Sequence, residues 1–565
     1  MTRELRWEAP GPGPWEAETA HFPKPLPYFG RERVQEAFKQ GFAASSARYG
    51  LLLSHFDTAF VNGFWYQQPV AFGAPKGAKG PPPGPVLWLL TRLHPGMRAR
   101  IRTTERAFAD KLWRQDLARW DEQDKPAALA KHQALLAIDL TTLSDDALSQ
   151  HLAAVVDHVA EMVALHHHYT VTCILPVGDL LMHVSDWTGE APGAILAMLR
   201  GTTPISRGIL AGELDALASA LRADEEGRDV LAGKDAAQVV DALCALSGAT
   251  GAAAREFFEG IRHRALSYEI SSKAAGELPE MLVGAVRAAV RGDAVGDGAG
   301  DAAAKLASIR AKVPEAHRAH FDELLAEARH INRLRDERGI YADGFALGIG
   351  RRAVLEVGRR LVARGSLHAP DHAVDLALDE AIALLSGNAG PTADDVAARV
   401  TWRTNNSVAD VPPTLGGVPA PPPDPSVFPP AARRAARAVD IVIQNLFKEA
   451  ETTSTATVVR GLSVNEGVYE GTARLISSPS EFDRLQQGDV LVTRATAPYF
   501  NVVLPLLGAI VTDRGGQLCH AAIVAREYGI PGVVGTKEAT TLIPDGARVR
   551  VDGTKGEVIL LSEPN

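Results

Sequence analysis

Residues 515–527 read GGQLCHAAIVARE. An apolar run at 508–512 precedes them and predicts a strand that ends at Thr512. The two glycines permit a tight turn, and we expect a helix to begin near Leu518. Backbone N–H groups and the positive end of the helix dipole then gather at this turn, where they attract an anion.

The histidine of this segment, His520, lies in the first turn of the expected helix. There an imidazole can take a phosphoryl group on one ring nitrogen while a neighbouring group holds the other. A single histidine after a glycine turn is also a common feature of ordinary helix caps. The surrounding sequence therefore has to decide between the two interpretations.

The residues around this segment predict a compact α/β domain. Short β-branched runs alternate with helical stretches near 498–507 and 518–528, as in a sheet with crossover helices. The runs lie at residues 489–493, 508–512, 531–535, 548–552 and 557–561.

The preceding part of the chain has a helical period. Ser144 is a suitable N-cap for a helix over 143–172, because two acidic residues and then an apolar face follow it. The same period recurs in segments with strong helix formers and predicts an antiparallel helical assembly over 90–402. These segments are 191–222, 236–265, 278–291, 301–338, 344–365, 371–386 and 392–402.

Nine prolines between residues 412 and 430 favour an extended linker over packed structure. We therefore predict a multidomain chain in which a large mainly α-helical domain precedes a small α/β domain. The predicted domains are a helical acceptor-binding domain at 1–410, a proline-rich linker with a short helix at 411–457, and the α/β domain at 458–565. Two Gly-rich segments, 71–85 and 291–300, are expected to be loops.

The composition excludes several classes of protein. The chain has 565 residues with 59 Lys and Arg against 68 Asp and Glu, a net charge of −9, which gives no reason to expect nucleic acid or an anionic membrane as a partner. Three scattered cysteines fit neither a disulfide framework nor a four-cysteine zinc site. With no signal-like N-terminus and no apolar run of membrane-spanning length, we expect a cytoplasmic protein.

Residues 461–561 resemble the phosphohistidine swivelling domain of the phosphoenolpyruvate-utilising enzymes, which include phosphoenolpyruvate synthase and rifampicin phosphotransferase. The resemblance implies that His520 is the carrier histidine, phosphorylated at one active site and moved by domain rotation to a second. The features that carry it are Gly467, Gly471-Thr472-Ala473-Arg474, Asp489-Val490-Leu491-Val492-Thr493, Gly515-Gly516, the run from His520 to Glu527, Gly529-Ile530-Pro531 and Val551-Asp552-Gly553.

Four residues near His520 are expected to bind the phosphoryl group. Gly515 and Gly516 form the turn, and Cys519 occupies a position that is a small Ser or Cys in this family. Thr493 ends a predicted strand, where its hydroxyl can donate a hydrogen bond to the phosphoryl group or simply cap the strand. Cys519 can equally be a small buried residue that shapes the turn.

The order of the parts resembles rifampicin phosphotransferase without its ATP-grasp domain, and also the divided subunits of phenylphosphate synthase. Residues 1–450 contain no Gly-rich phosphate loop, so no cofactor is expected to bind through a motif of this chain. We expect ATP and Mg²⁺ to act through a separate ATP-grasp partner protein. The acceptor is expected to be a small hydroxylated organic substrate.

A stretch of the helical part also resembles these phosphotransferases, in which an Arg-acid helix motif faces the acceptor site. It consists of the run Leu334-Arg335-Asp336-Glu337-Arg338-Gly339, followed by Gly350-Arg351-Arg352, Gly358-Arg359-Arg360-Leu361 and Asp379-Glu380. Arg335 can hold phosphoryl oxygens as charge builds, and Asp336 can take the proton of an attacking hydroxyl. Such a run of charged residues is also typical of an ordinary solvent-exposed helix face.

The run His166-His167-His168 does not predict a metal site, because successive helical side chains point about 100° apart. No other ligand spacing suggests a metal. One of these histidines can instead contribute to the acceptor pocket, and the sequence does not say which.

The predicted function is transfer of a phosphoryl group from His520 to a hydroxyl of the acceptor. Two alternatives stay open. One is dehydration, in which phosphorylation makes the hydroxyl a leaving group, and the other is a non-catalytic phosphocarrier or regulatory module. A deep apolar cleft within reach of His520 would favour an enzyme, whereas a filled core with Arg335 in solvent would favour a carrier.

Overall fold

The computed structural model describes residues 5–19, 21–75, 77–78, 80–202, 210–292, 299–447, 454–455, 457–477, 479–496, 500 and 503–562. Most of the expected loop at 291–300 and four of the ten residues of the expected helical stretch at 498–507 lie outside these residues. Within them, none of the helices combines the length and the hydropathy that crossing a membrane requires.

Helices dominate the chain, as the period predicted. Ser144 caps α6 by accepting a hydrogen bond from the Ala147 N–H at 3.2 Å, so the predicted start of this helix is confirmed. The helices are α1 (Arg31–Tyr49), α2 (Gly84–Leu93), α3 (Pro95–Ala109), α4 (Leu112–Arg119), α5 (Lys125–Leu136), α6 (Asp145–His168), α7 (Thr170–Thr188), α8 (Pro192–Leu196), α9 (Ala211–Ala223), α10 (Glu225–Leu231), α11 (Ala236–Ala245), α12 (Gly248–Ile261), α13 (Pro279–Arg291), α14 (Ala299–Lys312), α15 (Arg318–Asn332), α16 (Leu334–Arg338), α17 (Gly344–Ala363), α18 (Leu378–Leu385), α19 (Ala393–Asn405), α20 (Pro430–Phe447), α21 (His520–Tyr528) and α22 (Ala539–Leu542).

In the part of the chain that the structure describes, the strands form two sheets, one of four strands and one of eight. They are β1 (Trp15–Ala17), β2 (Leu53–Val61), β3 (Phe64–Ala71), β4 (Thr414–Leu415), β5 (Val458–Arg460), β6 (Leu462–Asn465), β7 (Val468–Leu475), β8 (Asp489–Thr493), β9 (Leu507–Thr512), β10 (Gly532–Val534), β11 (Arg548–Asp552) and β12 (Glu557–Ser562). The five strands predicted near the C-terminus are β8 to β12, and each lies within one residue of its expected bounds.

The chain folds into two compact units that are each built from several segments. Unit 1 comprises residues 1–175, 268–272 and 337–439, and unit 2 comprises residues 176–267, 273–336 and 440–565. This division differs from the predicted boundaries at 410 and 457. The reason is that helices from the middle of the chain share an apolar core with the C-terminal sheet, and helical periodicity does not say which surface an apolar face will meet.

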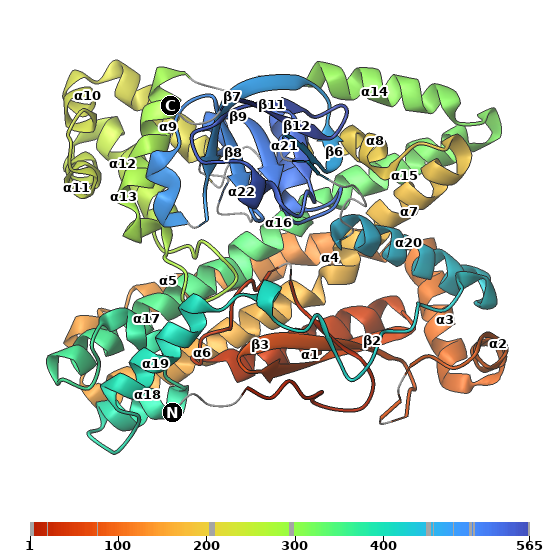
Figure 1. Cartoon of the computed structure of the whole chain (residues 1–565), viewed down its shortest axis with the longest axis horizontal. Coiled ribbons are helices and arrows are strands. Elements are labelled where there is room, and N and C mark those ends of the chain that lie inside the picture. The colour runs from red at the N-terminus through yellow and green to blue at the C-terminus, as the bar shows by residue number, and fades with distance from the viewer. Residues whose placement is uncertain are drawn as a thin grey trace. The chain divides into compact units, whose positions relative to one another are not determined.

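Unit 2 is built around the eight-stranded sheet, in the order β5-β12-β11-β7-β8-β9-β10-β6. Its centre, from β7 to β10, is parallel, and the outer strands pair antiparallel. The helix α21 connects the parallel neighbours β9 and β10 and packs against both of them and β6 (Figure 1). The carboxyl ends of β8 and β9 therefore meet at one edge, which is where α/β sheets place their ligands.

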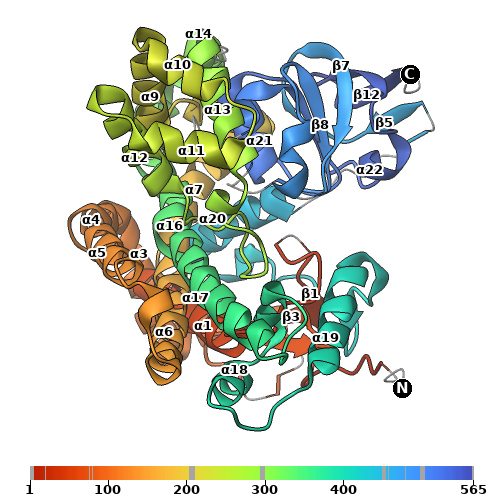
Figure 2. The same cartoon turned by 90° about the vertical axis from the view of Figure 1, so that its left-hand side faces the viewer.

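Apolar residues bury both faces of this sheet. On one face Leu491 and Ile510 join a core with α21 and with residues of α9, α11, α12 and α13, such as Leu217 and Phe257. Figure 2 shows the helices α9 to α13 gathered as one group. The other face packs against α22 through residues such as Ala539. The sheet is thus covered on both faces behind the edge that carries His520.

Unit 1 joins a helical body to the small sheet β2-β3-β1-β4, which the sequence analysis missed. Its signal was present, because Asn62 and Gly63 join β2 to β3 with φ values of 51° and 88°, as the commonest two-residue hairpin turn requires. The strand β4 lies inside the predicted linker and pairs with β1, so part of that linker is packed structure. In Figure 1 the helix α1 lies beside β2.

Candidate functional site

His520 is the first residue of α21, just beyond the carboxyl end of β9. The helix begins two residues later than predicted, because Cys519 is extended (φ −66°, ψ 163°) and serves as the N-cap. The half-buried His520 ring therefore projects at the edge where the central parallel strands end. This position fits the predicted role of a phosphate-accepting histidine.

A threonine that the sequence analysis did not select holds the His520 ring. The hydroxyl oxygen of Thr496 lies 2.9 Å from His520 Nδ1. The predicted residue, Thr493, is buried and its hydroxyl donates to the Ile476 carbonyl oxygen at 2.6 Å. Thr496 follows β8 by three residues, so its place beside His520 depends on the pairing of β8 with β9 and not on local sequence.

We expect Thr496→Val to slow phosphorylation of His520 by about tenfold, because it removes a hydrogen bond that orients the ring. The rate of adduct formation by mass spectrometry measures this effect. Thr493→Val is the matched control, since it loses a buried hydrogen bond to the backbone and should lower stability without slowing phosphorylation. Equal rates for wild type and Thr496→Val would contradict the assigned role.

Burial, assisted by the positive charge of Arg335, lowers the pKa of His520 to about 3. The ring is therefore neutral near pH 7 and retains a lone pair for attack on phosphorus. Histidines have an ordinary pKa near 6.5 and are largely protonated at pH 5. We expect the His520 ¹³C signal, identified by its loss in His520→Ala, to stay at its neutral position from pH 8 down to pH 5. A midpoint near 6.5 would contradict this environment.

The predicted Arg335 does reach the turn before His520. Its guanidinium donates a hydrogen bond to the carbonyl oxygen of Leu518. Arg335 and Asp336 also line a cavity of about 20 Å³ together with Arg526 and Glu527 of α21. Such a cavity has room for about one water molecule and not for an organic acceptor.

The glycine turn is shaped as predicted, but some of its N–H groups are engaged. Gly515 has φ +105°, and a Cβ there would lie 2.6 Å from Cys519 Sγ, so glycine is required. The N–H of Gly516 donates a hydrogen bond to the Leu446 carbonyl oxygen at 3.0 Å. The N–H of Leu518 donates to the Asn445 carbonyl oxygen at 2.8 Å. The last turn of α20 thus occupies two of the donors expected to bind the phosphoryl group.

Cys519 behaves as a neutral thiol. Burial raises its pKa, and the nearby N–H groups of Ala522 and Ala521 only partly oppose that shift. An uncharged thiol does not repel a phosphoryl group on the next residue. This arrangement is compatible with either of the two interpretations given to Cys519 above.

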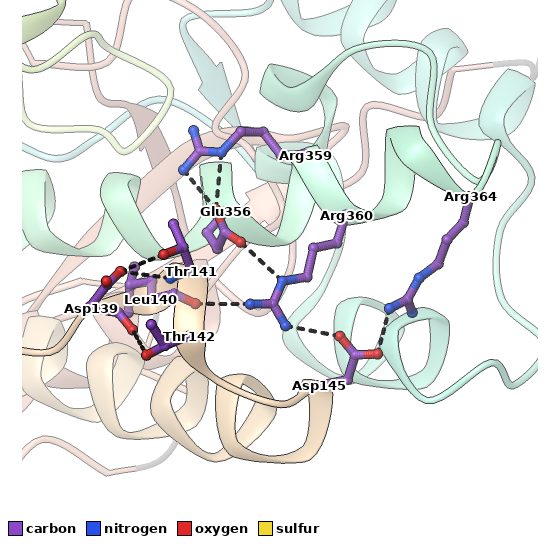
Figure 3. A network of polar contacts seen from close by, with 9 residues as sticks. All are labelled: Asp139, Leu140, Thr141, Thr142, Asp145, Glu356, Arg359, Arg360 and Arg364. Carbon is purple, nitrogen blue, oxygen red and sulfur yellow. Dashed lines mark hydrogen bonds and ion pairs between the residues drawn. The ribbon is translucent and has the colours of Figure 1, made fainter.

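Other charged residues of the resembling helical stretch are engaged within unit 1. Glu337 accepts hydrogen bonds from Trp120 Nε1 at 3.0 Å and Lys125 Nζ at 3.1 Å. Arg359 and Arg360 both contact Glu356, and Arg360 extends to Asp145 and the Leu140 carbonyl oxygen (Figure 3). Arg360 therefore ties α17 to α6 and the segment before it, whereas Arg359 contacts a residue of its own helix.

The comparisons with known proteins concern this same C-terminal part. Residues 485–556 match the family described as PEP-utilising enzyme, mobile domain. A probable phosphoenolpyruvate synthase of Archaeoglobus fulgidus is 46% identical over 101 residues, which are 18% of this chain and 13% of that protein. A rifampicin phosphotransferase of Streptomyces sp. is 47% identical over 102 residues, 18% of this chain and 12% of that protein.

The phosphoenolpyruvate synthase of Pyrococcus furiosus is 47% identical over 112 residues, 20% of this chain and 14% of that protein. The similarity thus spans between 12% and 14% of the length of these three relatives. The resemblance to the PEP-utilising enzymes is therefore confirmed for the C-terminal part of the chain, whose residues 485–556 match their mobile domain.

Proposed function

We propose that this chain is a phosphotransferase component in which His520 accepts a phosphoryl group and passes it to a hydroxyl of a small organic acceptor. The observation that carries the proposal is the neutral His520 ring at the start of α21, oriented through Nδ1 by Thr496, in a segment that matches a mobile domain. The named phosphotransferases among the relatives support the same class of reaction.

The two steps follow from the orientation of the ring. Thr496 holds Nδ1, and we propose that the phosphoryl group is taken on Nε2. In the first step the Nε2 lone pair attacks phosphorus, an N–P bond forms, and the donor leaves with the electrons of its own bond to phosphorus. In the second step the acceptor oxygen attacks phosphorus, an O–P bond forms, and the N–P bond breaks. Arg335 supplies positive charge near the ring as negative charge builds.

We propose that a separate ATP-grasp protein phosphorylates His520 with ATP and Mg²⁺. The test is intact-protein mass spectrometry after incubation with ATP and Mg²⁺, with and without a candidate ATP-grasp protein. We expect an acid-labile adduct on His520 only when the partner is present. An adduct with ATP alone would overturn the need for a partner, and no adduct with either ATP or phosphoenolpyruvate would overturn the phosphohistidine mechanism.

A further inference from the structure

We infer that His166, oriented by Asp343, is the base in unit 1 that takes the proton from the acceptor hydroxyl during phosphoryl transfer. The inference rests on the proposed function and adds the residue that activates the acceptor. The cavity beside Arg335 is too small for an organic acceptor, so an acceptor site has to be sought elsewhere. The best-equipped group of side chains lies at the end of α6.

The histidine and the aspartate form a buried hydrogen-bonded pair. His166 Nδ1 lies 3.0 Å from Asp343 Oδ1, and both residues are buried. The N–H of Gly344 donates to the same Oδ1 at 3.1 Å, which fixes the carboxylate. A carboxylate on Nδ1 sets the tautomer that leaves the Nε2 lone pair available, as in the bases of acyl-transfer enzymes.

The second ring nitrogen is the one that reacts. Among the described residues, no hydrogen bond involves His166 Nε2. The His166 side chain is 11% exposed to solvent, so the ring is not completely buried. A ring fixed on one nitrogen and unpaired on the other has the geometry of a general base.

An irregular helical turn lies at the same place. Asp343 ends a π-helical turn, η7 (Gly339–Asp343), which directly follows α16. Such turns are rare and occur often at functional sites. Gly339 begins this turn, and a Cβ there would lie 3.6 Å from His166 Cε1 and 3.9 Å from Asp343 Oδ1. The π-helical turn therefore brings its backbone directly against the pair.

A guanidinium with an open donor lies beside the pair. Arg338 Nη1 donates to the His166 carbonyl oxygen at 2.8 Å and to the Thr170 hydroxyl at 2.7 Å. Its buried Nε–H has no acceptor among the residues that the structure describes. A buried guanidinium donor without an acceptor is costly and fits an oxygen-bearing ligand.

Burial also sets the proton affinities of the pair. It raises the pKa of Asp343 to about 7, although the positive charge of Arg338 acts against that rise. It lowers the pKa of His166 well below its usual value, and here the charge of Arg338 acts in the same direction. The ring is consequently neutral before reaction. Once a proton arrives on Nε2, the adjacent carboxylate stabilises the imidazolium that forms.

The surroundings indicate the class of acceptor. His21 perturbs both His166 and Asp343 electrostatically, and 43% of its side chain is exposed. Its ring meets Tyr268 edge to face at 5.3 Å, and Phe38 packs in the same way on His167 at 4.5 Å. Partly exposed rings of this kind favour an acceptor with an aromatic body. The inferred acceptor is therefore a small aromatic alcohol.

The transfer step balances without any further reactant. The hydroxyl oxygen of the acceptor forms the O–P bond, the N–P bond at His520 breaks, and its electrons return to the imidazole ring. The hydroxyl proton goes to His166 Nε2. It leaves to solvent when the phosphoester is released.

The first test uses the full chain phosphorylated chemically with potassium phosphoramidate, so that no partner protein is needed. Phosphate on His520 is followed by mass spectrometry, and transfer to phenol, benzyl alcohol or glycerol is followed by ³¹P NMR. We expect His166→Gln and Asp343→Asn to be phosphorylated normally but to transfer at least about 100-fold more slowly to the aromatic alcohols. His158→Gln, which removes another buried histidine of α6, should transfer like wild type.

Each outcome has a distinct meaning. Wild-type transfer rates in His166→Gln would overturn the inferred base and leave the proposed function intact. Phosphorylated wild type that transfers to neither aromatic alcohol would overturn the inferred acceptor class. Wild type that takes no phosphoryl group on His520 would overturn the proposed function itself.

A second test needs no acceptor. Diethyl pyrocarbonate acylates an unprotonated, accessible imidazole nitrogen. We expect it to modify His166 faster than His132, because both ring nitrogens of His132 are engaged, by His158 and the Tyr341 carbonyl oxygen, each at 2.9 Å. Equal protection of the two residues would overturn the inference.

Discussion

The variant His520→Ala should form no acid-labile phosphoryl adduct with any donor. In the proposed mechanism the ring at residue 520 provides the nitrogen that attacks phosphorus, and the Thr496 hydroxyl that lies against it cannot form an acid-labile N–P bond. Intact mass before and after mild acid treatment measures the adduct. No other change is expected to have so large an effect on phosphorylation.

Two controls separate this loss from a general defect. His520→Gln keeps a polar side chain of similar size at the start of α21 and should also be inactive, which excludes collapse of an emptied site as the cause. His368→Ala removes a 55% exposed histidine that pairs with Asp394 and should be phosphorylated like wild type. A full adduct on either His520 variant would place the phosphoryl group on another residue.

A large loss of stability is expected for Arg360→Met. Glu356 is 6% exposed, and one of its oxygens accepts a hydrogen bond from Arg360 Nε at 3.0 Å. The same guanidinium donates to Asp145 at 3.0 Å and to the Leu140 carbonyl oxygen at 2.8 Å, which ties α17 to α6 and the segment before it (Figure 3). Removing one partner of a buried ion pair costs about 3 kcal/mol or more.

The neighbouring Arg359→Met is the matched control. Arg359 contacts the same carboxylate at 2.9 Å, but its side chain is 56% exposed against 17% for Arg360. An exposed pair contributes only about 0–1 kcal/mol. Thermal unfolding should therefore show a drop in Tm of roughly 5–10 °C for Arg360→Met and a much smaller drop for Arg359→Met. Similar small shifts in both variants would mean that the network of Figure 3 adds little stability.

Several features of the fold were available from the sequence because they depend on neighbouring residues. The start of α6 follows from Ser144 and the apolar period behind it, whereas the helix ends at His168, four residues before the predicted end. The strands β8 to β12 follow from short β-branched runs. The position of His520 at the start of α21 follows from a glycine turn between a strand and a helix, all within a few residues. The hairpin between β2 and β3 could also have been predicted locally, from the adjacent residues Asn62 and Gly63.

Other features depend on contacts between distant residues, which spacing along the chain does not encode. The pairing of β8 with β9 brings Thr496, and not Thr493, to His520. His166 and Asp343 are 177 residues apart and meet only through the packing of unit 1. The sequence by itself thus determined the helical character of the chain, the strands β8 to β12 and the histidine that can carry a phosphoryl group. The tertiary structure alone decided which side chains orient that histidine and which buried pair can receive a proton, because both depend on burial and long-range pairing.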